Sequence, residues 1–291
     1  MSSITFVVDK VEIVKANIRE IDELVKLHVE SLSYPMDSWL EDRLHESDIY
    51  NLMYESNCIG YAGLIKDTLQ FFYVRKDCFR YAPVIFEKIV SEKTIKRVFI
   101  MTQDSLLTAI IAEWDYEKEK QACWFTDSGR LGNMDTKVNH ALFRTATEKD
   151  TQRIRQTSGD FFDEVSGGFD CLEKRIAAEM IFLLEDNGEL LGCGIVEKGQ
   201  FCSGVASIGM YANRDCRRKG VAKTILMNLK EWAYHNNLRP VSGCWYYNTL
   251  SRKSLESVGM IATSIGYEAI LKGKETLPLR TGNPPGELVR N

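Results

Sequence analysis

Long apolar segments are missing from this sequence. No stretch approaches the ~18 uninterrupted apolar residues that a bilayer-spanning helix needs. The first ten residues hold one short apolar run with no basic region before it, unlike a secretory signal. We therefore expect a cytoplasmic protein that has no membrane partner.

The sequence is also poor in groups that could bind a metal or form a disulfide framework. Its histidines are never three or four residues apart, the spacing that brings two ligands together on a helix face. Its eight cysteines are scattered and form no C-x-x-C pair. We expect reduced, mostly buried cysteines and no metal site. The four histidines are His28, His45, His140 and His235.

Charge of one sign is not in excess either. The chain has 37 Lys and Arg against 41 Asp and Glu, a formal net charge of -4, which would not recruit nucleic acid or anionic lipid. Apolar residues make up 44% and charged residues 27%, as in an ordinary globular protein. A length of 291 residues favours two domains.

An internal repeat of long period supports this division. The segment 73–86 is similar to 211–224, and the apolar block 49–65 is similar to 180–196. Each half alternates strand-like and helix-like patterns, an α/β order with a mixed sheet. The polar, glycine-rich stretch 126–137 separates the halves, and after Leu271 the sequence is a tail without periodicity. We predict domains at 1–130 and 138–291.

A basic turn in the second half has the features of an anion site. The pattern predicts a buried strand over 206–212, a turn over 213–220 and a helix from Val221. Free N–H groups and the dipole at a helix N-terminus favour negative charge, and Gly220 lets a ligand approach the backbone. A pyrophosphate suits this site, unless the turn is merely a solvated helix start. The surrounding cations are Arg214, Arg217, Arg218, Lys219 and Lys223.

Two motifs give the second half a specific resemblance. Residues 217–222, Arg-Arg-Lys-Gly-Val-Ala, resemble the [Q/R]-x-x-G-x-[G/A] signature of the GNAT superfamily of acyl-CoA-dependent N-acyltransferases. Residues 248–260 resemble its N-x(10)-G-[FM] helix. The resemblance covers about 141–271 and implies two tandem GNAT-like domains of the α/β class, each a central mixed, mostly antiparallel sheet flanked by helices.

The first half resembles the same architecture in a degenerate form. Its turn reads Phe-Arg-Tyr-Ala-Pro-Val over 79–84, so Ala82 replaces the glycine and most cations are missing. Asp104 stands near the position of Asn248. This half could complete the substrate pocket, pack as a pseudo-dimer partner or stabilise the other half. Its aromatic residues Phe71 and Phe72 could pack in a core or line a pocket.

The resemblance implies acetyl-CoA as co-substrate and direct attack on its thioester by a primary amine, which we expect to belong to a small molecule. The family's usual tyrosine acid is replaced by Leu255, and its strand glutamate is missing. Catalytic candidates are therefore Glu197, which could instead be an exposed hairpin residue, and Tyr247. Asn248 could cap a helix or contact the ligand. The cofactor-binding candidates are Met210, Tyr211, Ala212, Arg217, Arg218, Lys219, Gly220, Val221, Ala222, Lys223, Asn248 and Ser251.

Two other functions stay open at this stage. One is a catalytically inactive acyl-CoA-binding regulatory protein, suggested by Leu255 and the missing strand carboxylate. The other is an aminoacyl or peptidyl transferase that uses a carrier nucleic acid, against which the near-neutral charge argues. We expect a monomer or a homodimer.

Overall fold

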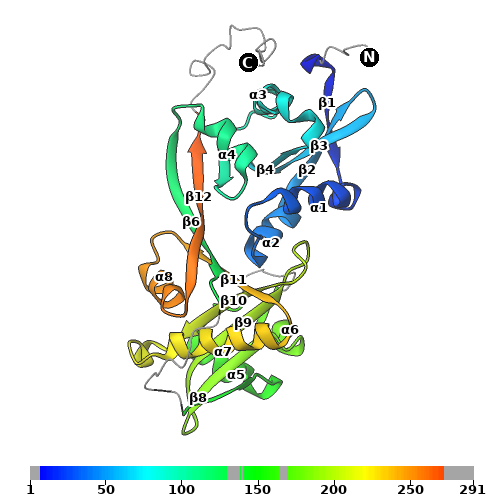
Figure 1. The fold of residues 1–291 in the computed structure, drawn as a ribbon. Coiled ribbons are helices and arrows are strands. Elements are labelled where there is room, and N and C mark those ends of the chain that lie inside the picture. Colours follow the sequence, from blue (N-terminus) through cyan, green and yellow to red (C-terminus); the bar gives the residue numbers. More distant parts are fainter. Residues whose placement is uncertain (1–6, 130–137, 139, 164–169, 272–291) are drawn as a thin grey trace.

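The computed structural model describes residues 7–129, 138, 140–163 and 170–271. The molecule is elongated, with the two halves of the chain stacked end to end (Figure 1). Twelve strands of the described residues form one sheet that runs through both halves, in the order β1-β2-β3-β4-β5-β12-β6-β11-β10-β9-β8-β7.

The first half has a three-layer arrangement. Helices α3 and α4 pack on one face of its strands, and helices α1 and α2 cover the other. Its elements are β1 (Val11–Ala16), α1 (Asp22–Ser31), α2 (Ser38–Glu46), β2 (Asp48–Tyr54), β3 (Asn57–Ile65), β4 (Thr68–Val74), α3 (Ala82–Glu92), β5 (Arg97–Met101), α4 (Ser105–Ala112) and β6 (Glu117–Asp127).

The second half repeats this arrangement. Helices α7 and α8 pack on one face, and α5 and α6 lie on the other. Along α7 the apolar residues Val221, Ile225, Leu226, Leu229 and Ala233 recur at helical spacing and are buried. The elements are β7 (Leu142–Thr145), α5 (Thr151–Ser158), α6 (Leu172–Ala177), β8 (Ile181–Asp186), β9 (Glu189–Lys198), β10 (Val205–Ala212), α7 (Val221–His235), β11 (Arg239–Trp245), α8 (Thr249–Glu256) and β12 (Met260–Ile270).

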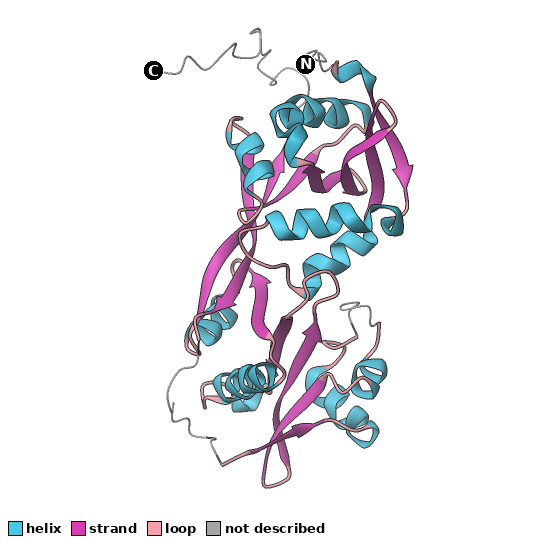
Figure 2. Ribbon diagram, turned by 45° about the vertical axis from the view of Figure 1, so that its right-hand side comes forward, coloured by secondary structure: helices cyan, strands magenta, loops and turns pink. Residues whose placement is uncertain are grey.

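The two halves exchange strands, which the repeat did not predict. Strand β12 ends the second half yet pairs with β5 of the first, where Gly266 lies opposite Met101. Strand β6 ends the first half yet pairs with β11 of the second, where Gly243 lies opposite Trp124. The two long strands also pair with each other, and Figure 2 shows them crossing the junction together. Each half therefore completes its sheet with a strand from the other.

Helix α2 is a second connection between the halves. Its residues Leu40 and Leu44 share a buried core with Val205 and Val241 of the second half. The carboxylate of Glu41 is fully buried and accepts the backbone N–H groups of residues 200, 201 and 202 at 2.7, 2.9 and 2.9 Å. Helix α2 is thus fixed against the β9–β10 hairpin by both apolar and charged contacts.

Phe71 and Phe72 are buried core residues, which answers the question left open by the sequence.

All eight cysteines lie in the described residues and are free thiols; four are buried and four partly buried. None of the helices described here has both the length and the apolar character needed to cross a bilayer. Most of the predicted linker and the tail after Leu271 lie outside the described residues.

Candidate functional site

The turn between β10 and α7 presents open backbone donors. Gly220 has a left-handed conformation with φ of 90°, and Arg218 also has a positive φ, 63°. The helix's first hydrogen bond runs from the N–H of Thr224 to the carbonyl of Gly220 at 2.9 Å. The N–H groups of residues 220–223 precede it and so have no acceptor within the helix. This arrangement can bind an anion.

Cationic side chains surround these donors. Arg217, Arg218 and Lys219 are exposed, and Lys223 is partly exposed on the first turn of α7. Guanidinium groups bind phosphate oxygens in a bidentate manner, and the helix dipole adds a partial positive charge at the same point. The sequence-predicted pyrophosphate residues are therefore brought together in one place.

The equivalent turn of the first half has a different backbone. A 3-10 helix, Lys76–Tyr81, runs directly into α3. Ala82 occupies the position equivalent to Gly220 but has a right-handed conformation with φ of -55°, and it is fully buried. The first half therefore lacks the left-handed glycine that opens the second-half turn, which confirms a degenerate first copy.

Strands β10 and β11 diverge beside the turn. Their parallel pairing covers Val205 to Ser207 of β10. Strand β10 then continues to Ala212 while it pairs with β9 on its other edge. Past the last paired residue, the hydroxyl of Ser242 donates to the carbonyl of Ile208 at 2.8 Å. The backbone of 209–212 is thus free, within the described residues, to pair with an extended amide-bearing ligand along this edge.

Tyr211 uses its side chain on the face that carries α5. Its hydroxyl donates to the carbonyl of Thr157 at 2.9 Å, and its ring contacts Phe161 at a centroid distance of 5.3 Å. Met210 and Ala212 face the opposite core, against α7. Because the side chains of this strand segment are committed to packing, a ligand at the open edge would meet main-chain atoms.

The second family motif forms the start of α8. Asn248 caps this helix, because its Oδ1 accepts the N–H of Ser251 at 3.1 Å. Gly259, with φ of 76°, lies just beyond the helix end as expected. Leu255 is buried in the core, so it offers no proton donor. Tyr247 is 56% exposed and contacts the rings of Trp245 and Tyr246.

Glu197 is a buried residue of β9, so the alternative of an exposed hairpin residue was wrong. Its Oε2 accepts the hydroxyl of Ser38 at 2.6 Å, and its Oε1 lies 3.5 Å from Nε of Arg175. The backbone N–H of Ser38 donates to Oγ of Ser207 at 2.7 Å. The N-terminus of α2 is therefore bonded to β9 and β10 at the position where β10 and β11 separate.

Asp37, which sequence reasoning did not single out, lies beside this group. It is the N-cap of α2, and its Oδ1 accepts the N–H of Leu40 at 3.1 Å. Its Oδ2 occupies the space where Gly243 of β11 has no side chain, since a Cβ atom there would collide with it. The side chain of Trp124 completes the surroundings. Asp37 before Ser-Trp-Leu does signal a helix start, but nothing in that signal connects it to the second half.

Burial raises the pKa of Asp37 from 3.8 to about 7. Hydrogen bonds from Leu40 and Trp124 oppose this increase, whereas the nearby carboxylates of Glu197 and Glu41 add to it. The increase therefore comes first from desolvation of the charged form, and second from like charge. A carboxyl group of this kind can exchange a proton near neutral pH.

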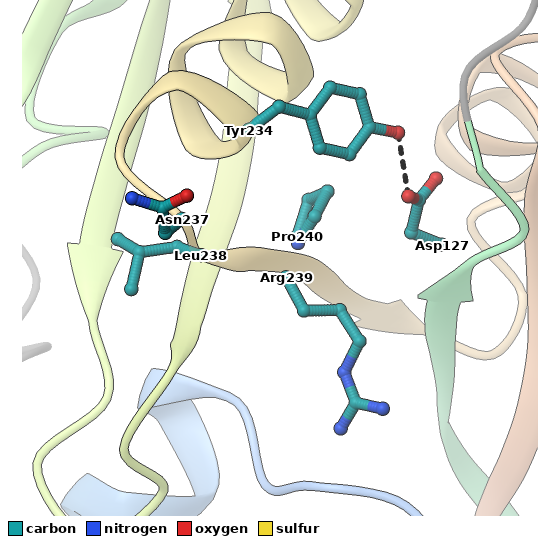
Figure 3. Close-up of a pocket in the computed structure, with 6 residues that line it drawn as sticks. All are labelled: Asp127, Tyr234, Asn237, Leu238, Arg239 and Pro240. Atoms are coloured by element: carbon teal, nitrogen blue, oxygen red, sulfur yellow. Dashed lines mark hydrogen bonds between the residues drawn. The ribbon is translucent and has the colours of Figure 1, made fainter.

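Two surface hollows lie away from the turn. One, of about 420 Å³, is lined by residues at the C-terminal end of α7 and the start of β11, where the hydroxyl of Tyr234 donates to Asp127 at 2.6 Å (Figure 3). The second, of about 510 Å³, lies between α1 and the loop over 200–205. Neither is lined by residues 217–223. No group of three or more potential metal ligands is found in the described part of the chain.

Comparison with known families matches each half of the chain separately. A model described as "Acetyltransferase (GNAT) domain" matches residues 17–128, and one described as "Acetyltransferase (GNAT) family" matches residues 144–260. The chain belongs to the GNAT superfamily. It is a tandem GNAT protein, and membership supports acyl transfer from an acyl-CoA.

Solved GNAT structures share this fold at low sequence identity. An acetyltransferase of the GNAT family from Colwellia psychrerythraea aligns with a TM-score of 0.77 at 15% identity, over 90% of this chain and 100% of that one. A GCN5-related N-acetyltransferase from Sphaerobacter thermophilus gives 0.57 at 13%, over 90% and 95%. A tandem GNAT protein from the clavulanic acid biosynthesis pathway gives 0.52 at 10%, over 89% and 97%. No curated protein matched the sequence.

Proposed function

We propose that this protein transfers an acetyl group from acetyl-CoA to a primary amine of a small molecule, by direct attack in a ternary complex. The observation that carries the proposal is the turn before α7, with its left-handed Gly220 and exposed cations. Its absence from the first half predicts one acetyl-CoA per chain. A small-molecule acceptor remains our expectation from the sequence.

The described residues fit acetyl-CoA along two adjoining surfaces. The pyrophosphate would be held by the backbone N–H groups of 220–223 and the side chains of Arg217, Arg218 and Lys219. The pantetheine amides would pair with the open edge of β10 at 210–212. Asn248 and Ser251 are mutually bonded at the start of α8, so they would contact the ligand only from that cap. Bound acetyl-CoA supplies the reactive thioester.

The protein's own groups then position the amine and manage its protons. A strand N–H beside the carbonyl would stabilise the developing oxyanion. Glu197 is the base that the sequence suggested, but its carboxylate accepts the hydroxyl of Ser38 and lies beside Arg175, which suits it better to hold these neighbours in place. Tyr247 remains the candidate acid, with an exposed side chain. Leu255 is buried and supplies no proton, and the thiolate could also leave without a protein acid.

The first test is calorimetry of the full chain with acetyl-CoA. Two equivalent arginines give a matched pair, because Arg218 and Arg80 are both exposed and occupy the same position in the two turns. We expect Arg218→Glu to weaken binding by about 1.5–3 kcal/mol, roughly tenfold or more in Kd, since it replaces a phosphate-binding cation with a like charge. Arg80→Glu should bind as the wild type does. Ala82 is unsuitable as a control because it is buried.

Turnover is measured next, as release of free thiol with a panel containing spermidine, glucosamine and tryptamine. Acetyl-CoA binding together with amine-dependent thiol release supports the proposal. Binding without turnover of any amine in the panel would favour the inactive acyl-CoA-binding protein. Equal loss of binding in both arginine variants would contradict the assignment of the site to the second half.

A further inference from the structure

We propose that the first half supplies the base of the reaction: Asp37, at the N-terminus of α2, takes the proton from the acceptor ammonium in the active site of the second half. This inference rests on the proposed function and assigns to one residue a step that the sequence left open. It also gives the degenerate half a direct part in catalysis.

The position of Asp37 carries the inference. Ser38, the next residue, is bonded to Ser207 of β10 at 2.7 Å and to Glu197 of β9 at 2.6 Å. Ser207 is the last residue of β10 that pairs with β11. The Asp37 carboxylate itself faces Gly243, two positions past the last paired residue of β11. Asp37 is therefore held where β10 and β11 separate, close to the edge of β10 proposed for acetyl-CoA.

We expect the acceptor to approach this carboxylate from the side of Gly243. The glycine is exposed, although Asp37 beneath it is only 6% exposed. Exposed aromatic side chains of Trp245 and Tyr247 continue from Gly243 along the same segment, and aromatic faces attract ammonium groups. These rings could hold the ammonium group of the acceptor on its way to Asp37.

The step balances with the groups named. The ammonium gives one proton to the Asp37 carboxylate, and the freed nitrogen lone pair forms the C–N bond with the thioester carbonyl carbon. The C–S bond then breaks and its electron pair leaves on sulfur. The second proton of the attacking nitrogen passes to that sulfur, directly or through water, which gives the amide and a thiol. Release of Asp37's proton to solvent restores the carboxylate.

The charged surroundings determine when Asp37 is ionised. Glu41 faces it from the same helix, and Glu197 faces it from β9 with Arg175 of α6 behind. The thiols of Cys202 and Cys244 also lie within its field, but burial raises the pKa of each to about 11, so both are neutral near pH 7. The two neighbouring carboxylates therefore disfavour the charged form of Asp37. Activity should rise as pH increases through about 7, because the base must be deprotonated.

The test compares wild type with Asp37→Asn, which retains an acceptor for the Leu40 N–H, and with Glu46→Gln, an exposed change on the same helix. The amine is whichever member of the panel releases thiol fastest. We expect Asp37→Asn to bind acetyl-CoA within about twofold of wild type while kcat/KM for the amine falls roughly 10²- to 10⁴-fold near pH 7. The rise of kcat/KM through pH 7 should disappear. Glu46→Gln should keep both.

A second variant tests the geometry without removing the carboxyl group. Gly243→Ala places a Cβ atom where Oδ2 of Asp37 lies, so it should lower kcat for the amine with little effect on acetyl-CoA binding. If Asp37→Asn retains wild-type kcat/KM and its pH dependence, Asp37 is not the base. If wild type itself fails to bind acetyl-CoA or to turn over any amine, the proposed function fails and this assignment fails with it. The two failures are distinguished by the wild-type measurements.

Discussion

The burial of Asp37 makes a prediction about stability that needs no substrate. Its pKa is raised from 3.8 to about 7 in the folded protein, so the folded state binds this proton more tightly than the unfolded state does. For such an acid, stability falls as pH rises from about 4 to about 7 and is then constant. A difference of about three pH units corresponds to about 4 kcal/mol of destabilisation above pH 7.

Asp37→Asn removes this titration but retains the capping oxygen. By linkage, the raised pKa of Asp37 lowers the free energy of unfolding of the wild type by about 2 kcal/mol near pH 5 and by about 4 kcal/mol near pH 8. The stability of the variant relative to wild type should therefore improve by roughly 2 to 3 kcal/mol between these two conditions. The variant's amide could fit less well beside Trp124, but that effect is the same at both pH values and cancels in the comparison.

The assay is urea unfolding of both proteins at about pH 5 and about pH 8, followed by circular dichroism. Glu46→Gln is the control, because an exposed carboxyl group should give the same difference from wild type at both values. A difference between Asp37→Asn and wild type that does not change with pH would refute the raised pKa, and with it the reasoning that makes this carboxyl a proton acceptor near neutrality.

Two further predictions concern the junction of the halves. Glu41→Ala should cost about 2 to 4 kcal/mol in urea unfolding, because three backbone N–H groups of the 200–202 loop lose their acceptor; a loss below about 1 kcal/mol would mean that water replaces the carboxylate. Chains split within 130–137 should be insoluble or associated when expressed separately and should recover acetyl-CoA binding when co-expressed, since each lacks a strand of its sheet. Size-exclusion chromatography checks the second, and a soluble monomeric second half that binds acetyl-CoA would contradict it.

The sequence predicted those parts of the site that depend on local pattern. The turn over 217–223 was recognisable because its glycine, its cations and the stripe of α7 are adjacent in the chain. The loss of the same turn at Ala82 was readable for the same reason, since one Cβ and the missing cations change the local chemistry. The cap at Asn248 was one of two readings and is observed. Such features are set by neighbours within one turn of helix.

Contacts between distant segments were not predictable in this way. Ser38 and Glu197, whose side chains are bonded, are 159 residues apart, and no periodicity connects them. Alternation of apolar residues predicts that 117–127 is a strand but does not say which strands lie beside it. The interpretation of Glu197 as an exposed hairpin residue failed for this reason: the helix that covers it comes from the other half of the chain.

The exchange of strands explains why the first half can lose its anion turn and still be required. Strand β6 completes the second-half sheet through its pairing with β11, and Trp124 of this strand also lies against Asp37. The same half positions α2, whose Glu41 fixes the β9–β10 hairpin while Asp37 and Ser38 meet the opening between β10 and β11. None of these contacts involves the turn at Ala82, so changes there leave the junction intact.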